Sequence, residues 1–144
     1  MTTPPLPAAD LPTAIATRLA DRPASRVALA FLDAMQRRDL STAGAFLAPD
    51  FVMCFPGGHT MRRLEELVQR SGQRYRHVAK RFERVDEAPI DDGVGVYCSG
   101  TLYGVWADGS AFEGIRFIDR FEVVGGRIRR QDVWNDVGGM TSAK

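Results

Sequence analysis

The order of the hydrophobic patterns predicts an α+β fold in which a curved antiparallel sheet wraps round N-terminal helices. Apart from one short strand, helical patterns occupy the first half of the chain and alternating strand patterns occupy the second. Turns that contain glycine separate the late strands at residues 91–93, 107–109 and 125–126. Helices that come first and strands that follow are typical of α+β domains, in which the helices pack on one side of a sheet.

The composition indicates a single soluble domain. The chain has 144 residues, of which 44% are hydrophobic and 26% are charged, and this is enough to form one core. Proline is too dense in residues 1–10 for a helix, so this segment is predicted to be a disordered tail. Residues 11–137 are expected to form the domain and residues 138–144 a C-terminal tail.

The charge balance argues against several classes of partner. The formal net charge is +1, from 19 basic and 18 acidic side chains, so there is no strong field to attract nucleic acid or a membrane surface. The N-terminus lacks the pattern of a secretory signal, and no segment approaches the about 20 apolar residues that cross a bilayer. A cytoplasmic protein that binds a small molecule, without nucleic acid or membrane, is therefore expected.

Four helices are predicted. Residues 11–20 form a short one, and residues 24–38 form a longer one with an apolar stripe at Val27, Phe31 and Met35. A third short segment, residues 42–48, ends before a proline. Thr60 is predicted to cap the fourth helix, whose inward residues are Met61, Leu64, Leu67 and Val68.

Five strands are predicted, at residues 51–55, in the second half of 75–85, and at 94–106, 111–124 and 127–137. The segment 75–85 is ambiguous, because Tyr75, Val78, Phe82 and Val85 suit a helix, whereas Val78, Lys80, Phe82 and Arg84 suit one face of a strand.

Asp119 is the leading candidate for a functional residue. It interrupts the apolar alternation of Ile115, Phe117, Phe121 and Val123, so a carboxyl group is placed on a buried face. Burial disfavours the charged form and raises the pKa, as an acid or hydrogen-bond donor in a cavity requires. The alternative is structural, with Asp119 paired to an arginine or bonded to a backbone amide.

Two further residues are secondary candidates for acid or base chemistry. His59 follows the Pro56-Gly57-Gly58 turn near the expected mouth of a pocket, although a solvated loop histidine is the simpler interpretation. Asp136 shares parity with Trp134 on the last strand, so it would add a second acid if that face is internal. The opposite parity, with Val133 and Asn135 inside, is equally compatible with the pattern.

Aromatic side chains are the candidates for substrate binding, because they offer wide contact areas to a flat organic ligand. They are Phe31, Phe55, Tyr97, Phe117, Phe121 and Trp134. A basic tract around His77, which includes Lys80, reads as a solvated face or a phosphate site. An outer sheet face built from Val105, Ile118 and Val133 is the alternative that predicts a protein partner. No spacing of histidine, cysteine or acidic residues predicts a metal site.

The chain resembles the nuclear transport factor 2-like superfamily, and especially its SnoaL-like branch, which includes polyketide cyclases and ketosteroid isomerases. The resemblance covers residues 24–137. The motifs that carry it occur in this order: Arg38-Asp39-Leu40, Pro49-Asp50-Phe51, Phe55-Pro56-Gly57-Gly58, Gly126-Arg127-Ile128 and Trp134-Asn135-Asp136. The resemblance implies a cone-shaped, cystatin-like α+β barrel with a deep apolar pocket and a homodimer formed through the outer face of the sheet.

The family's catalytic patterns match only in part. In the ketosteroid isomerase pattern the general base would fall on Phe55 and the tyrosine on Phe31, so both groups are missing. The acid that donates a hydrogen bond to an oxyanion would fall on Asp119. In the epoxide hydrolase pattern an arginine and an aspartate lie two residues apart, whereas Arg116 and Asp119 lie three apart.

The sequence therefore predicts a small-molecule pocket protein. The leading hypothesis is a cofactor-free lyase, isomerase or hydrolase, with cyclase and dehydratase chemistry included, that acts on a small apolar organic substrate through Asp119. The alternative is a noncatalytic ligand-binding or dimerisation domain, as occurs in this family.

Overall fold

The computed structural model describes residue 4 and residues 11–140. The elements in chain order are α1 (Thr13–Arg18), α2 (Pro23–Gln36), α3 (Leu40–Gly44), β1 (Leu47–Phe55), β2 (His59–Met61), α4 (Leu64–Arg74), β3 (Tyr75–Ile90), β4 (Gly93–Trp106), β5 (Ala111–Val124), β6 (Arg127–Asn135) and α5 (Val137–Met140). Apart from residue 4, the predicted tail at residues 1–10 lies outside the described residues, as do the last four residues.

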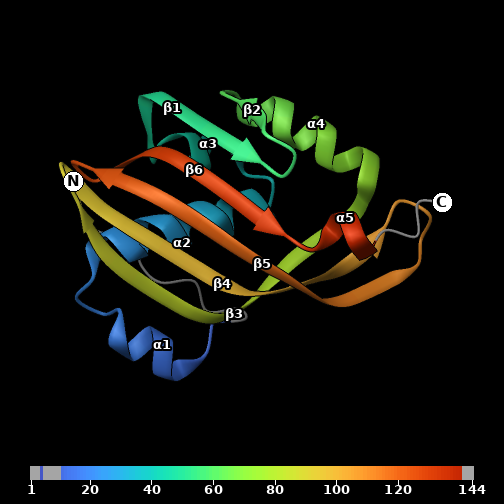
Figure 1. The fold of residues 1–144 in the computed structure, drawn as a ribbon, viewed down its shortest axis with the longest axis horizontal. Coiled ribbons are helices and arrows are strands. Elements are labelled where there is room, and N and C mark those ends of the chain that lie inside the picture. Colours follow the sequence, from blue (N-terminus) through green and yellow to red (C-terminus); the bar gives the residue numbers. More distant parts are fainter. Residues whose placement is uncertain (1–3, 5–10, 141–144) are drawn as a thin grey trace.

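The strands form one six-stranded sheet in the order β2-β1-β6-β5-β4-β3 (Figure 1). Strands β3 to β6 are an antiparallel meander, as the glycine-containing turns predict. One pairing differs from the expected antiparallel pattern, because β1 runs parallel to β6. The sheet is curved and does not close, which confirms the predicted α+β fold.

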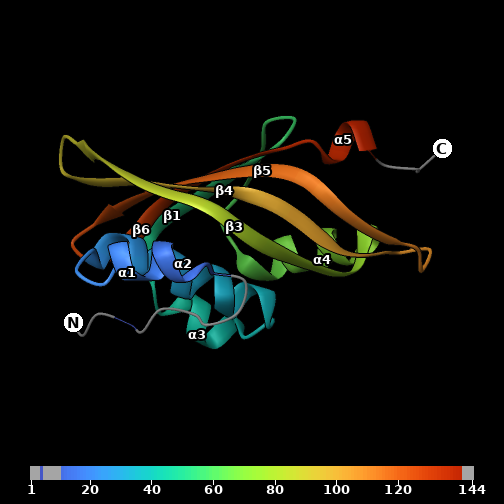
Figure 2. The same cartoon turned by 90° about the horizontal axis from the view of Figure 1, so that it is seen from below.

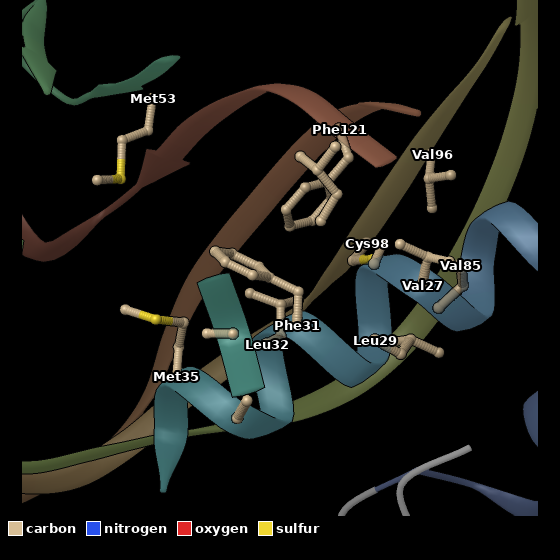
Figure 3. Packing of buried hydrophobic residues seen from close by; sticks show 14 of the residues in the cluster. Val27, Leu29, Phe31, Leu32, Met35, Met53, Val85, Val96, Cys98 and Phe121 are labelled. Carbon is tan, nitrogen blue, oxygen red and sulfur yellow. The ribbon is translucent and has the colours of Figure 1, made fainter. Parts of the chain in front are cut away.

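Helices α1 to α4 lie on the same side of the sheet, and α2 crosses its concave face (Figure 2). The apolar stripe of α2 faces the strands, so Phe31 contacts Phe121 of β5 and Phe51 of β1 edge to face, with ring centroids 5.9 and 6.2 Å apart. Figure 3 shows this centre of the core, in which Phe31, Leu32 and Met35 of α2 are among the buried side chains. The helix thus closes one side of the hollow.

Glycines in β4 permit the strong curvature of the sheet. A Cβ atom at Gly100 would collide with the carbonyl oxygen of Arg81, and one at Gly104 would collide with that of His77. Both glycines face β3 close to places where the β3–β4 register shifts. Bulges and glycines at such positions bend a sheet. The bend produces a deep concave face, which leaves space between the sheet and the helices that cover it.

The same bulges explain the ambiguous pattern of residues 75–85, which are strand throughout. Each bulge inserts one residue, so the inward side chains lie at Tyr75, Val78, Lys80, Phe82 and Val85. Their spacing of three at each bulge imitates helical periodicity. A regular alternation would have placed Arg84 on the inner face, but the structure places it on the outside.

Four predicted boundaries need correction. Helix α3 ends at Gly44, and β1 already begins at Leu47 rather than at residue 51. Thr60 does not cap a helix, because it pairs with Cys54 in the β1–β2 hairpin; α4 begins only at Leu64, without a side-chain cap. The last strand ends at Asn135, whose side-chain oxygen accepts a hydrogen bond from the Val137 backbone N–H, 3.1 Å away. The short helix α5 therefore starts at the predicted domain boundary.

Candidate functional site

A cavity of about 470 Å³ lies between α2, α4 and the concave face of the sheet. This volume is in the range of sites for drug-sized ligands. Its walls are mainly apolar, and the larger apolar side chains are Phe31, Leu32, Met35, Phe55, Met61, Leu67, Val68, Val78, Leu102, Phe117 and Val133. A few polar groups are set among them.

Asp119 lies in this wall. Strand alternation in β5 points it inward between Phe117 and Phe121, and its side chain is only 1% exposed. Neither carboxyl oxygen has a hydrogen-bond partner among the described residues. The nearest charge is the Lys80 ammonium, whose Nζ lies 3.6 Å from Oδ2, which is an ion-pair distance just beyond a hydrogen bond.

Burial raises the pKa of Asp119 above its ordinary value of 3.8, and the Lys80 charge opposes part of this shift. Cys98 lies directly across the β4–β5 ladder from Asp119. Its thiol is also buried, and burial together with the Asp119 charge raises its pKa. Burial thus favours the neutral, protonated forms of both Asp119 and Cys98. A protonated carboxyl group in such surroundings can donate a hydrogen bond or a proton to a bound molecule.

Lys80 is the functional candidate that the sequence analysis did not select. It lies in β3 on the same face as Val78 and Phe82, and its side chain is 25% exposed. Its ammonium is 5.1 Å from the centroid of the Phe117 ring. The shared parity of Lys80 with two apolar residues was visible in the sequence, but the surrounding basic tract indicated a solvated face.

Two glutamine amides also belong to the wall. Gln131 of β6 is buried, and its Oε1 has no hydrogen-bond partner among the described residues. Gln36 of α2 accepts a hydrogen bond from the backbone N–H of Lys80 at 3.2 Å. Because β3 is an edge strand, this N–H has no partner strand, and Gln36 satisfies it. The helix is thereby tied to the strand that carries Lys80.

Five of the predicted site residues line this one cavity: Phe31, Phe55, His59, Phe117 and Asp119. They come from α2, β1, β2 and β5, so distant parts of the sequence meet at the same hollow. His59 is exposed and therefore belongs to the mouth of the cavity, whereas Asp119 belongs to its buried wall.

The other four predicted residues do not line the cavity. Tyr97 and Trp134 lie on the convex face of the sheet, 36% and 55% exposed. Asp136 forms an ion pair with Arg116 on that side, with Oδ2 2.6 Å from Nε. Phe121 points inward, but it is fully buried in the core against Phe31 and is not part of the cavity wall.

The parity of the last strand explains these positions. Gln131, Val133 and Asn135 face the cavity, so Trp134 must face outward. Val133 therefore cannot belong to the outer patch that the sequence suggested, although Ile118 does, at 45% exposed.

Within residues 4 and 11–140, no group of three or more His, Cys, Asp or Glu side chains is placed to hold a metal ion. No helix in the same part of the chain is long and apolar enough to span a membrane.

A curved sheet that folds over helices, with a deep apolar cavity between them, defines a class of small-molecule-binding domains with the nuclear transport factor 2-like fold. The sequence model of the SnoaL-like domain matches residues 28–131, and the chain belongs to this family. A search of curated proteins finds no significant match.

Solved structures share the fold. An NTF2-like protein of unknown function from Burkholderia pseudomallei is 18% identical, with a TM-score of 0.70 over 81% of this chain and 93% of that one. An LEH-like epoxide hydrolase of M. tuberculosis is 27% identical, with a TM-score of 0.62 over 81% of this chain and 85% of that one. TerC, crystallised with polyporic acid, is 16% identical, with a TM-score of 0.64 over 81% and 93%.

Proposed function

We infer that this protein is a cofactor-independent enzyme that binds a small organic molecule with an apolar body and acts on it by proton transfer. The observation that carries this proposal is the buried carboxyl group of Asp119, which lines an apolar cavity and lacks a hydrogen-bond partner among the described residues. Unsatisfied buried polar groups cost about 1–3 kcal/mol, so they are uncommon unless a ligand or water completes them.

Asp119 and Lys80 have different roles in this proton transfer. Protonated Asp119 donates its proton, or a hydrogen bond, to an oxygen atom of the substrate. The carboxylate that remains after proton transfer is stabilised by the Lys80 ammonium 3.6 Å away. Lys80 thereby lowers the cost of ionising a buried acid during turnover. An isomerisation, a dehydration, a cyclisation or the opening of an epoxide each needs such a donor.

Two structural neighbours support a site for a small organic molecule, without naming a substrate for this chain. One structural neighbour is named an epoxide hydrolase, and another was crystallised with polyporic acid. The epoxide hydrolase pattern that the sequence lacks has its arginine two residues from an aspartate. In this chain the residue two before Asp119 on the inner face is Phe117, not an arginine. The cation beside Asp119 is Lys80, which comes from β3, two strands away in the sheet.

The test is turnover by matched variants. Wild-type protein is incubated with a panel of small epoxides and of cyclic ketones in deuterated water, and NMR detects ring opening or deuterium exchange next to the carbonyl group. Asp119→Asn should abolish the reaction of any substrate found. Asp132→Asn is the control, because Asp132 lies on the convex face in ion pairs with Arg120 and Arg130. Equal activity of both variants would remove Asp119 from the mechanism.

The second candidate function is a noncatalytic ligand-binding or dimerisation domain. It is favoured by the convex face of the sheet, where Tyr97, Ile118 and Trp134 are exposed large hydrophobic residues. Such a patch suits the face of a homodimer. Light scattering on wild-type protein and on Trp134→Glu tests this assembly, since a charge within the exposed apolar patch should give a monomer. A wild-type monomer at high concentration would contradict it.

A further inference from the structure

The cavity gathers positive charge that the rest of the molecule does not show. Four of the 19 Lys and Arg side chains line it, together with His59, whereas Asp119 is the one acidic residue of the described lining. The whole chain carries a net charge of only +1. The basic residues of the lining are Arg38, Arg70, Arg74 and Lys80. A near-neutral protein therefore encloses a distinctly basic site.

The three arginines belong to the mouth of the cavity. Arg70 and Arg74 lie one turn apart in the last part of α4, and Arg38 lies in the turn that follows α2; all three are exposed. Arg38 is tied to α4 by a hydrogen bond from Nη2 to the Ser71 hydroxyl oxygen at 3.2 Å. The cations thus surround one opening between the two helices that flank the cavity.

None of these three arginines has a carboxylate partner within the described part of the chain. Arg38 donates only to neutral oxygens, those of Met35 and Ser71. Four arginines on the convex face of β5 and β6 differ from these three, because each of the four forms an ion pair: Arg116, Arg120, Arg129 and Arg130. Cations left without an anion beside an apolar cavity are placed to receive one from a ligand.

We propose that the ligand of this cavity is an amphipathic carboxylate, with its apolar body against the aromatic wall and its anionic head at Arg70 and Arg74. This inference rests on the proposed function and adds the chemical class of the ligand. Lys80 is not assigned to the head, because it lies in the wall beside Asp119 with its side chain only 25% exposed, whereas Arg70 and Arg74 are exposed at the mouth. The buried end of the ligand would then present a neutral oxygen or reactive carbon to Asp119, while the charged head stays near water.

The probe pair is 2-naphthylacetic acid and 2-naphthylacetamide, which share their apolar body and differ in the charge of the head. Isothermal titration calorimetry at neutral pH and low salt should show that the acid binds about tenfold more tightly than the amide. Raising the salt to about 0.5 M should reduce this preference, because exposed charges are then screened. Equal affinities of the two probes at low salt would overturn the proposal.

Arginine variants locate the anionic head. Arg70→Gln and Arg74→Gln should each reduce the affinity for the acid several-fold and leave the affinity for the amide unchanged. Arg62→Gln is the matched control, because Arg62 is an exposed arginine just before α4 that does not line the cavity. If both the Arg70 and the Arg74 variants still prefer the acid to the amide, the carboxylate does not bind at the mouth of the cavity and the proposal is overturned.

The failure of this inference can be told apart from the failure of the proposed function. If both probes bind with equal affinity, the cavity is still a small-molecule site, and only the proposal of an anionic ligand fails. Absence of binding by both probes, and by a wider set of neutral aromatic compounds, would remove the ligand site itself. All three variants change exposed side chains, so their folding can be verified by circular dichroism and thermal unfolding before titration.

Discussion

The two faces of the sheet give acidic side chains opposite environments, with opposite effects on the pKa. On the convex face, Glu122 accepts a hydrogen bond from Arg129 Nη2 at 2.8 Å and another from Arg120 Nη1 at 2.9 Å. These contacts hold the pKa of Glu122 below its ordinary value. On the concave face, three residues earlier in the same strand, Asp119 has no hydrogen bond among the described residues, and burial raises its pKa.

The difference separates a stabilising surface from a reactive one. Fully paired carboxylates keep their charge and fix the geometry of the strands. A buried carboxyl group without a hydrogen-bond partner lowers the stability of the fold, and it can exchange protons with a bound molecule. Strand alternation allows both to exist in β5, because neighbouring side chains point to opposite faces.

The largest contrast concerns the aromatic residues of the two faces. Phe121→Ala should lower the free energy of unfolding by about 3–5 kcal/mol, because it opens a cavity in the fully buried core beside Phe31. Trp134→Ala should cost less than about 1 kcal/mol in the monomer, since that side chain is largely exposed. Urea unfolding at low protein concentration measures both, and similar losses would contradict the assignment of the two faces.

Asp119→Asn should reveal the cost of the buried acid through its pH dependence. The folded-state pKa of Asp119 is raised above 3.8, so the folded protein retains a proton that the unfolded chain releases. The stability of the wild type should therefore fall as the pH rises from about 4 through the folded-state pKa. The Asn variant lacks this loss.

Relative to wild type, Asp119→Asn should thus gain about 1–3 kcal/mol between acidic and mildly basic pH. Chemical unfolding over a range of pH values measures this gain. A stability difference that is constant with pH, or that shrinks as the pH rises, would show that Asp119 is not held in its neutral form.

Glu122→Gln should behave with the opposite sign. The folded-state pKa of Glu122 is lowered below 4.5, chiefly by the hydrogen bond from Arg129, so its contribution is present above that pH and is lost on acidification. The variant should lose about 0.5–1 kcal/mol at neutral pH and almost nothing at strongly acid pH. The same unfolding series serves as the test, and a loss that persists in acid would point to packing rather than charge.

Arg116→Gln should have the smallest effect. Its guanidinium pairs with Asp136, but both side chains are extensively exposed to water. Exposed pairs are screened and lose side-chain entropy when they form, so their net contribution is small. No change in unfolding midpoint beyond experimental error is expected at about 0.15 M salt. A clear loss would indicate that the Arg116–Asp136 pair is covered in the native assembly.

Much of the fold follows from local sequence signals. The meander from Gly93 to Asn135 was predicted to within a few residues, because short turns with glycine join strands with strict alternation. The segment 75–90 was harder, because two bulges break the alternation. The β2 strand was missed since Thr60 fits both a helix cap and a hairpin, and pairing with Cys54 decides between them.

The site was predicted in part for the same reason. Asp119 and Phe117 were found from alternation within one strand, which is a local property. Tyr97 and Trp134 were misplaced because alternation says which residues share a face, but not which face is internal. Lys80 was overlooked because its partner, Asp119, lies 39 residues further along the chain and is brought near only by the β3–β4–β5 ladder.

The sequence by itself determined the α+β class, the order of the late strands and the inward acid at Asp119, since each depends on periodicity over a few residues. Only the tertiary structure decided which face of β6 lines the cavity, that Lys80 lies beside Asp119, and that the opening is flanked by arginines without an ion pair among the described residues. These features depend on sheet register, bulges and the placement of helices α2 and α4. Such long-range geometry arises from packing, which no local pattern in the chain specifies.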